Sequence, residues 1–175
     1  MARSIDLWRE SMLYWAHRLQ DLDFRQLMEV YEEGNLENAE IFYSDAPRNQ
    51  WLRLAEDAFY QYLRDCFYPT QEASYAIWIE DGRYVSALRL EPYRDGLLLE
   101  ALETDPRHRN KGYAAALIRA VLKELDGKRI YSHVGKRNAA SLAVHEKCGF
   151  YQISDTAAYI DGSVDSKAYT LSNMK

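Results

Sequence analysis

The chain reads Thr104-Asp-Pro-Arg-His-Arg-Asn-Lys-Gly-Tyr-Ala114 between a predicted strand and a predicted helix. Gly112 allows a positive φ or a close approach of another molecule to the backbone, and Ala114 keeps the first helical turn slim. The backbone N–H groups from about Asn110 to Ala114 have no partners inside the helix, and the positive end of the helix dipole lies behind them. This arrangement predicts a binding site for an anion.

Three basic side chains in the same loop, Arg107, Arg109 and Lys111, add charge-assisted donors. Several donors favour a pyrophosphate over a single carboxylate. The alternative is a basic, solvated loop with a glycine where the helix starts. Neither of the usual nucleotide loops, Gly-x-x-x-x-Gly-Lys-Ser/Thr or Gly-x-Gly-x-x-Gly, occurs in the chain.

A second block reads Asn138-Ala-Ala-Ser-Leu-Ala-Val-His-Glu-Lys-Cys-Gly-Phe150. With the first block it resembles the GCN5-related N-acetyltransferase (GNAT) family. The acetyl-coenzyme A loop of that family reads Arg/Gln-x-x-Gly-x-Gly/Ala, which is Arg109-Asn-Lys-Gly112-Tyr-Ala114 here. The second signature of the family is an Asn, two helical turns and a Tyr-Glu-Lys-x-Gly-Phe-like ending. The two blocks keep the family's order and spacing over roughly 97–151, whereas the front half matches only in its order of helix, helix and hairpin.

The resemblance implies a mixed α/β (α+β) fold, with a central, mostly antiparallel sheet splayed between its middle strands and helices on both faces. It implies acetyl-coenzyme A as co-substrate, with no metal. The pantetheine arm enters the splay and bonds to the strand before the loop. The implied coenzyme-binding residues are Leu102, Glu103, Thr104, Arg109, Asn110, Lys111, Gly112, Tyr113, Ala114, Asn138 and Ser141.

Hydrophobic periodicity and turn residues predict one domain over 1–175, with a mostly helical front half (about 1–70). The resemblance implies that this half is the acceptor side and that about 75–160 is the coenzyme-binding core. The predicted helices are one or two over 6–33, then 51–67, 111–125 and 138–147, with a loop or short turns over 34–50. The predicted strands are 75–79, 84–90, 97–104, 129–134, 150–159 and 168–171, with hairpin turns at Asp81-Gly82 and Asp95-Gly96.

A proton donor for the departing thiolate is the first catalytic group to look for. Relatives have a tyrosine seven residues after the motif asparagine, but this chain has His145 there. Helical spacing places Asn138, Ser141 and His145 on one stripe, and an imidazolium can supply a proton near neutral pH. Alternatively, His145 fills space or interacts with the helix C-terminus, and Asn138 is a helix N-cap.

A base for the acceptor ammonium is the second catalytic group. One branch of the family, which acetylates protein N-termini, has a glutamate five residues before the motif asparagine, where this chain has His133. Glu100 and Glu103 compete for the role. Strand alternation gives them opposite side-chain directions, so we expect at most one to face the cleft.

Charge is distributed unevenly along the 175 residues, whose net charge is −5. Residues 1–87 carry 8 Arg and no Lys against 16 Asp and Glu, a net of −8, and residues 88–175 carry 14 Lys and Arg against 11 Asp and Glu, a net of +3. An acidic front half attracts ammonium groups such as those of polyamines, aminoglycosides or lysine side chains. For any single one of these carboxylates, a helix face in water is the simpler interpretation.

These features predict an enzyme that transfers an acetyl group from acetyl-coenzyme A to a primary amine of a small molecule or a peptide N-terminus, by direct attack in a ternary complex. The alternative is a catalytically impaired module that binds acyl-coenzyme A. The acidic balance argues against nucleic acid as a partner, including charged transfer RNA. We expect no membrane partner and leave a homodimer open. We expect a cytoplasmic location, because the N-terminus lacks a secretory signal and Cys66 and Cys148 fit no metal or redox spacing.

Overall fold

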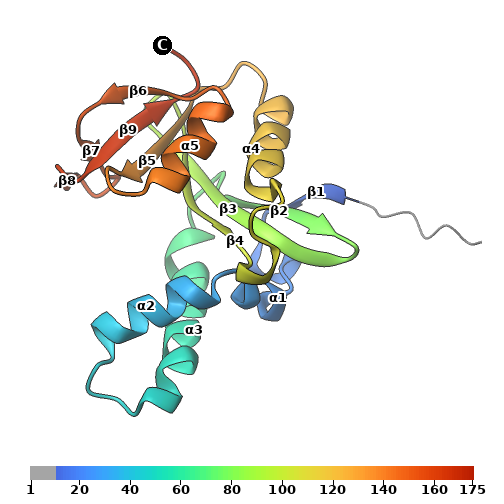
Figure 1. The fold of residues 1–175 in the computed structure, drawn as a ribbon, viewed down its shortest axis with the longest axis vertical. Coiled ribbons are helices and arrows are strands. Elements are labelled where there is room, and N and C mark those ends of the chain that lie inside the picture. Colours follow the sequence, from blue (N-terminus) through green and yellow to red (C-terminus); the bar gives the residue numbers. More distant parts are fainter. Residues whose placement is uncertain (1–10) are drawn as a thin grey trace, which may run out of the picture.

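The computed structural model describes residues 11–175, which fold around a seven-stranded sheet (Figure 1). Its strand order is β1 (Ser11–Ala16), β2 (Ser74–Glu80), β3 (Arg83–Tyr93), β4 (Gly96–Thr104), β5 (Ile130–Gly135), β9 (Ala168–Ser172) and β6 (Tyr151–Ser154). The short strands β7 (Ala157–Ala158) and β8 (Val164–Asp165) form a separate hairpin. The α-helices are α1 (Phe24–Val30), α2 (Glu32–Phe42), α3 (Trp51–Tyr62), α4 (Tyr113–Glu124) and α5 (Ala139–Lys147).

Every neighbouring pair in the large sheet is antiparallel except β4 and β5, which are parallel. These two strands pair only from Leu97–Leu99 to Ile130–Ser132, although both continue beyond the last pair. The sheet is therefore splayed between its middle strands. The predicted fold class, mixed and mostly antiparallel, is confirmed.

A β-bulge in β4 lies next to the splay. Arg89 of β3 is opposite Glu100, but Ala87, two residues away, is opposite Glu103, so β4 carries one extra residue. Ala101 lies in this bulge and has a φ of 50°. A bulge shifts the alternation of side chains, so residues on either side of it change their expected faces.

Two apolar clusters cover the two faces of the sheet. Alternate strand residues supply them: Tyr75 and Ile77 pack with residues of α1 and the turn after α3, whereas Ala76 packs with α4. In Figure 1, α2 and α3 extend from the lower end of the molecule and α4 and α5 lie at the upper end. Helices therefore lie on both faces, as predicted.

The hairpin predicted at Asp81-Gly82 is confirmed, with Gly82 at a φ of 77°. The second hairpin is present too, but its turn is Arg94-Asp95, one residue earlier than predicted, because Gly96 already pairs with Tyr93. The predicted helices over 51–67, 111–125 and 138–147 correspond to α3 with the π-helical turn Leu63–Phe67, to α4 and to α5. The predicted strand over 150–159 is divided into β6 and β7.

Two predictions for the front half are wrong. The helix predicted from residue 6 is the edge strand β1 from Ser11, where Met12 to Trp15 pair with β2, while residues 6–10 lie outside the described part. The loop predicted over 34–50 contains α2, which buries Asn35 and Ala39. In both segments tertiary contacts override local propensity, because pairing with β2 and packing against α3 are invisible to a local pattern.

Gly96 fixes the start of β4 against the segment that leads into β5. A Cβ there would lie 2.0 Å from the Arg129 carbonyl oxygen, which accepts a hydrogen bond from the Leu97 N–H at 3.0 Å. We expect Gly96→Ala to lower the free energy of unfolding by about 2–4 kcal/mol, because one of two backbones must move. Gly135→Ala is the matched control, since a Cβ there meets nothing within 4 Å. Urea titration checks the pair, and equal stabilities would contradict the close approach.

Candidate active site

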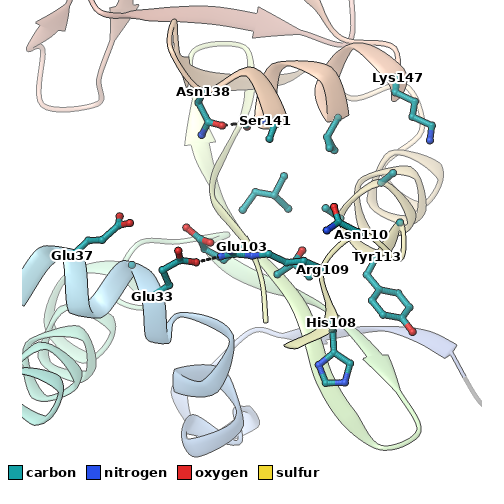
Figure 2. A pocket seen from close by; sticks show the side chains of 18 residues that line it. Glu33, Glu37, Glu103, His108, Arg109, Asn110, Tyr113, Asn138, Ser141 and Lys147 are labelled. Carbon is teal, nitrogen blue, oxygen red and sulfur yellow. Dashed lines mark hydrogen bonds and ion pairs between the residues drawn. The ribbon is translucent and has the colours of Figure 1, made fainter. Parts of the chain in front are cut away.

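A cavity of about 520 Å³ opens beside the splay (Figure 2). Four elements wall it: the end of β4, the N-terminus of α4, one side of α5 and the start of α2. Ten of the eleven residues predicted to bind the coenzyme line it, namely Leu102, Glu103, Thr104, Arg109, Asn110, Gly112, Tyr113, Ala114, Asn138 and Ser141. Lys111 is the exception.

The N-terminus of α4 has the geometry that binds an anion. Gly112 is the N-cap, with a φ of 81°, and the first helical bond joins the Ala116 N–H to its carbonyl at 3.0 Å. The four preceding N–H groups therefore have no intrahelical partner. A Cβ at Gly112 would meet nothing within 4 Å, so the space in front of these donors is open. The donors and the space fit a pyrophosphate.

The basic side chains of the loop do not all reach this space. Arg109 lines the cavity but forms an ion pair with Glu33 of α2. Arg107 instead pairs with Asp105 at 2.9 Å and with Glu32 at 3.9 Å. Arg107, Arg109 and Lys111 were predicted to bind phosphate together. Of these three, only Arg109 lines the cavity.

A lysine that sequence reasoning missed supplies a second cation. Lys147, at the end of α5, lines the cavity on the same helix side as Ser141 and Val144 (Figure 2). The spacing of three residues along a helix is the signal that could have found it.

The strand β4 presents unpaired backbone to the cavity. After Leu99, no strand of residues 11–175 pairs with β4 on the side of β5, and further along β4 Leu102 to Thr104 line the cavity. Free N–H and C=O groups on an open strand edge are a template for another extended chain. This edge fits a ligand with amide groups, as a pantetheine arm has.

Asn138 has both of the roles considered for it from the sequence. Its side chain accepts a hydrogen bond from the Ser141 N–H at 3.1 Å, so it is the N-cap of α5, and it also lines the cavity. In Figure 2, Asn138 and Ser141 lie on the wall opposite Glu103 and Arg109.

His145 does not line the cavity. It is buried, 1% exposed, with its ring 5.1 Å from that of Phe150 in an edge-to-face arrangement. Its Nδ1 lies 2.8 Å from the Ser141 carbonyl oxygen, so Nδ1 carries the proton, and Nε2 has no partner in the described part of the chain. Burial lowers the pKa of His145, which favours a neutral ring. A neutral ring with an unprotonated Nε2 is a poor proton donor.

His133 lies apart from the cavity as well. Its ring is held edge-to-face between Tyr93 at 5.4 Å and Tyr159 at 4.9 Å. Neither ring nitrogen has a hydrogen-bond partner among residues 11–175. Burial, and to a smaller extent Arg94, lower the pKa of His133. The ring is therefore a neutral group inside an aromatic cage.

The expectation that Glu100 and Glu103 face opposite sides is wrong, because the bulge at Ala101 lies between them. Glu100 is paired with Arg89 and Glu103 with Ala87, and residues 87 and 89 lie on one face of β3. Both glutamates therefore lie on the face of the sheet that carries Arg89. Glu103 lines the cavity beside Arg109, and burial raises its pKa against the opposing effect of that arginine. Burial and the neighbouring Glu91 raise the pKa of Glu100 to about 7.

Acidic side chains of α2 form the remaining wall. Glu33 and Glu37 are four residues apart on this helix and both line the cavity (Figure 2). The sequence predicted negative charge in the front half but not this pair on one helix, because it divided the segment into a helix that ends at Glu33 and a loop that contains Glu37. No helix of the described residues is long and apolar enough to cross a membrane.

Comparison with known proteins gives a consistent family and fold. The model of the acetyltransferase (GNAT) family matches residues 35–150. No curated protein sequence matches the chain significantly.

Solved structures resemble the chain along almost its whole length. The PaiA N-acetyltransferase of Thermoplasma acidophilum, in complex with coenzyme A, is 13% identical, with a TM-score of 0.57 over 92% of this chain and 98% of that one. The ribosomal-protein-S18-alanine N-acetyltransferase of Escherichia coli is 15% identical, with a TM-score of 0.57 over 93% and 92%. A GNAT-family acetyltransferase of Bacillus cereus is 14% identical, with a TM-score of 0.58 over 93% and 96%.

Proposed function

Since the chain belongs to the acetyltransferase (GNAT) family, we propose that it transfers the acetyl group of acetyl-coenzyme A to a primary amine, of a small molecule or a peptide N-terminus, by direct attack in a ternary complex. The observation that carries the proposal is the single cavity that joins the open N-terminus of α4 to the unpaired edge of β4. Acetyl-coenzyme A supplies an acetyl group activated as a thioester, together with a pyrophosphate and an amide-containing arm.

The residues of the cavity divide the binding of such a molecule between them. The N–H groups of residues 112–115 donate to the pyrophosphate, with Arg109 and Lys147 as flanking cations. The backbone of Leu102, Glu103 and Thr104 bonds to the pantetheine arm as an added strand would. Asn138 and Ser141 lie beside the arm, on the side of the cavity that α5 forms.

Glu103 is our choice for the base. It lines the cavity, whereas His133 is enclosed by aromatic rings, and its raised pKa suits a group that accepts a proton near neutral pH. In the transfer, the Glu103 carboxylate accepts a proton from the acceptor ammonium, and the neutral amine nitrogen bonds to the acetyl carbon. The carbon–sulfur bond breaks, and the second proton that the nitrogen loses goes to the departed thiolate, so coenzyme A leaves as its thiol.

The departing thiolate needs little help from an acid, because an ordinary thiol has a pKa of about 8.5 and its anion is a stable leaving group. His145 therefore serves as a packing residue of α5 in this proposal. Its buried ring beside Phe150 and its bond to Ser141 support that role.

Release of coenzyme A thiol from acetyl-coenzyme A, measured over a panel of primary amines, tests the proposal. We expect thiol release that depends on both the amine and its concentration, with the acetylated amine as the second product. Tight binding of acetyl-coenzyme A with no amine-dependent thiol over the whole panel would indicate the binding module instead.

A further inference from the structure

Arg89 is a half-buried cation that the coenzyme cavity does not use. Its guanidinium carbon lies 4.8 Å from the ring centre of Tyr62 and 5.6 Å from that of Phe67. Its Nε is buried and has no hydrogen-bond partner, and its guanidinium forms no ion pair with any of residues 11–175. A buried charge without a close counter-ion is costly, so this position calls for an explanation.

The neighbouring carboxyl group lies too far from Arg89 for an ion pair. Glu100 is its partner across the strands, but the two side chains form no ion pair. The Oε2 atom of Glu100 is itself buried and has no hydrogen-bond partner in the part of the chain that the structure describes. Because burial raises the pKa of Glu100 to about 7, a large share of this group is uncharged at neutral pH. The positive charge of Arg89 is therefore available to another anion.

A second cavity, of about 340 Å³, opens directly onto Arg89. It lies between α2, α3 and β3, with amide groups from Asn35 and Asn38 and aromatic walls from Phe59 and Tyr62. A planar guanidinium binds a carboxylate through two parallel hydrogen bonds, and the amides add further donors. The aromatic rings give the cavity apolar walls for the rest of the ligand.

The second cavity lies close to the reacting centre of the proposed function. From Glu100, opposite Arg89, β4 passes through the bulge at Ala101 to Leu102, where the lining of the coenzyme cavity begins. Two residues of strand span about 7 Å. For a small molecule with one end at Arg89 to react, its other end must reach the coenzyme cavity past this segment of β4.

We propose that the acceptor is a primary amine that also carries a carboxylate, and that Arg89 binds this carboxylate while the amine faces the thioester. The proposal rests on the acetyl transfer proposed above and names its substrate class. It differs from the ammonium-rich acceptors expected from the acidic front half, because the group that selects the acceptor here is a cation.

Matched pairs of acceptors test it. Phenylalanine is compared with phenethylamine, and leucine with 3-methylbutylamine, by thiol release from acetyl-coenzyme A. Phenylalaninamide and the α-amide of glutamate separate an α-carboxylate from a side-chain carboxylate as the bound group. For the wild type we expect kcat/KM to favour the carboxylate-bearing member of a pair by about 100-fold, because a site with a buried charged donor discriminates strongly against a ligand that leaves it unpaired.

Two variants connect the preference to Arg89. In Arg89→Met we expect the ratio between carboxylated and uncarboxylated acceptors to fall to about 1, and in Arg89→Lys to be intermediate, because a lysine keeps the charge but not the planar fork. Arg53→Met, at an exposed position of the neighbouring α3, should keep the wild-type ratio. Binding of acetyl-coenzyme A, measured by calorimetry, reports whether each variant is folded.

The outcomes are distinct. A preference for carboxylated acceptors that Arg89→Met removes supports the proposal. Amine-dependent thiol release with no such preference, or with a preference that survives in a folded Arg89→Met variant, overturns it and leaves the acetyltransferase in place. No amine-dependent thiol release from any acceptor would instead overturn the proposed function.

Discussion

Gly112→Asp should weaken the binding of acetyl-coenzyme A by on the order of 100-fold or more, because it puts a negative charge where the pyrophosphate is expected. Gly112 is the N-cap of α4 and faces open space. An aspartate at an N-cap accepts hydrogen bonds from the first N–H groups of its own helix, so the new side chain would occupy the donors as well as repel the ligand. Calorimetric titration of the protein with acetyl-coenzyme A measures the effect.

Gly127→Asp is a closely matched control. Gly127 follows the other end of α4, has a φ of 79° against 81° at Gly112, and also faces open space. The backbone strain of the two variants is therefore similar, but Gly127 does not line the coenzyme cavity. We expect its affinity to stay within about two-fold of the wild type, since distant sites act independently. Equal affinities in the two variants would refute the assignment of the anion site.

Glu103→Gln should lower kcat by about 100-fold or more, which is the range in which a general base contributes. Glutamine keeps the size and hydrogen-bonding capacity of the side chain but cannot accept the ammonium proton. Glu40→Gln is the control, because Glu40 is an exposed residue of α2 outside the cavity. Steady-state thiol release measures both variants.

The pH profile separates a base from a structural role. Burial raises the pKa of Glu103 above its ordinary value of 4.5, so the active, ionised carboxylate is depleted at pH values where a free glutamate is already ionised. Activity should therefore rise with pH through this raised pKa, and Glu103→Gln should lose that rising limb. A variant that keeps both the rate and the limb would exclude Glu103 as the base without affecting the coenzyme site.

The coenzyme side of the site was predictable because its signals are local. Gly112 must adopt a positive φ where α4 begins, and Asn138 caps α5 through its own side chain. Each signal acts within one turn of the chain. These segments keep their predicted form in the structure.

The bulge in β4 was not predictable from local sequence. Ala101 adopts a φ of 50°, which glycine or asparagine would have signalled but alanine does not. The irregularity depends on the register against β3, a contact between strands. Missing it led to the wrong directions for Glu100 and Glu103, and these directions decide which carboxylates share a face with Arg89.

The stripe drawn through Asn138, Ser141 and His145 failed for a geometric reason. Asn138 has a φ of −86° and a ψ of 73°, so it lies outside the helix that begins at Ala139. Within α5, Ser141 lies at the edge of the side that faces the cavity, and His145 is about 40° further around the helix, away from Ala140, Val144 and Lys147. The cavity instead receives Ala140, Ser141, Val144 and Lys147, and His145 turns inward to Phe150.

A crystal structure of the protein with coenzyme A is the most direct test of the central claim, that the cavity at the N-terminus of α4 holds this molecule. We predict that oxygens of the pyrophosphate accept hydrogen bonds from backbone N–H groups of residues 112–115, and that the pantetheine arm lies along Leu102, Glu103 and Thr104. Coenzyme A bound at another surface, or an empty cavity at saturating coenzyme A, would contradict the account.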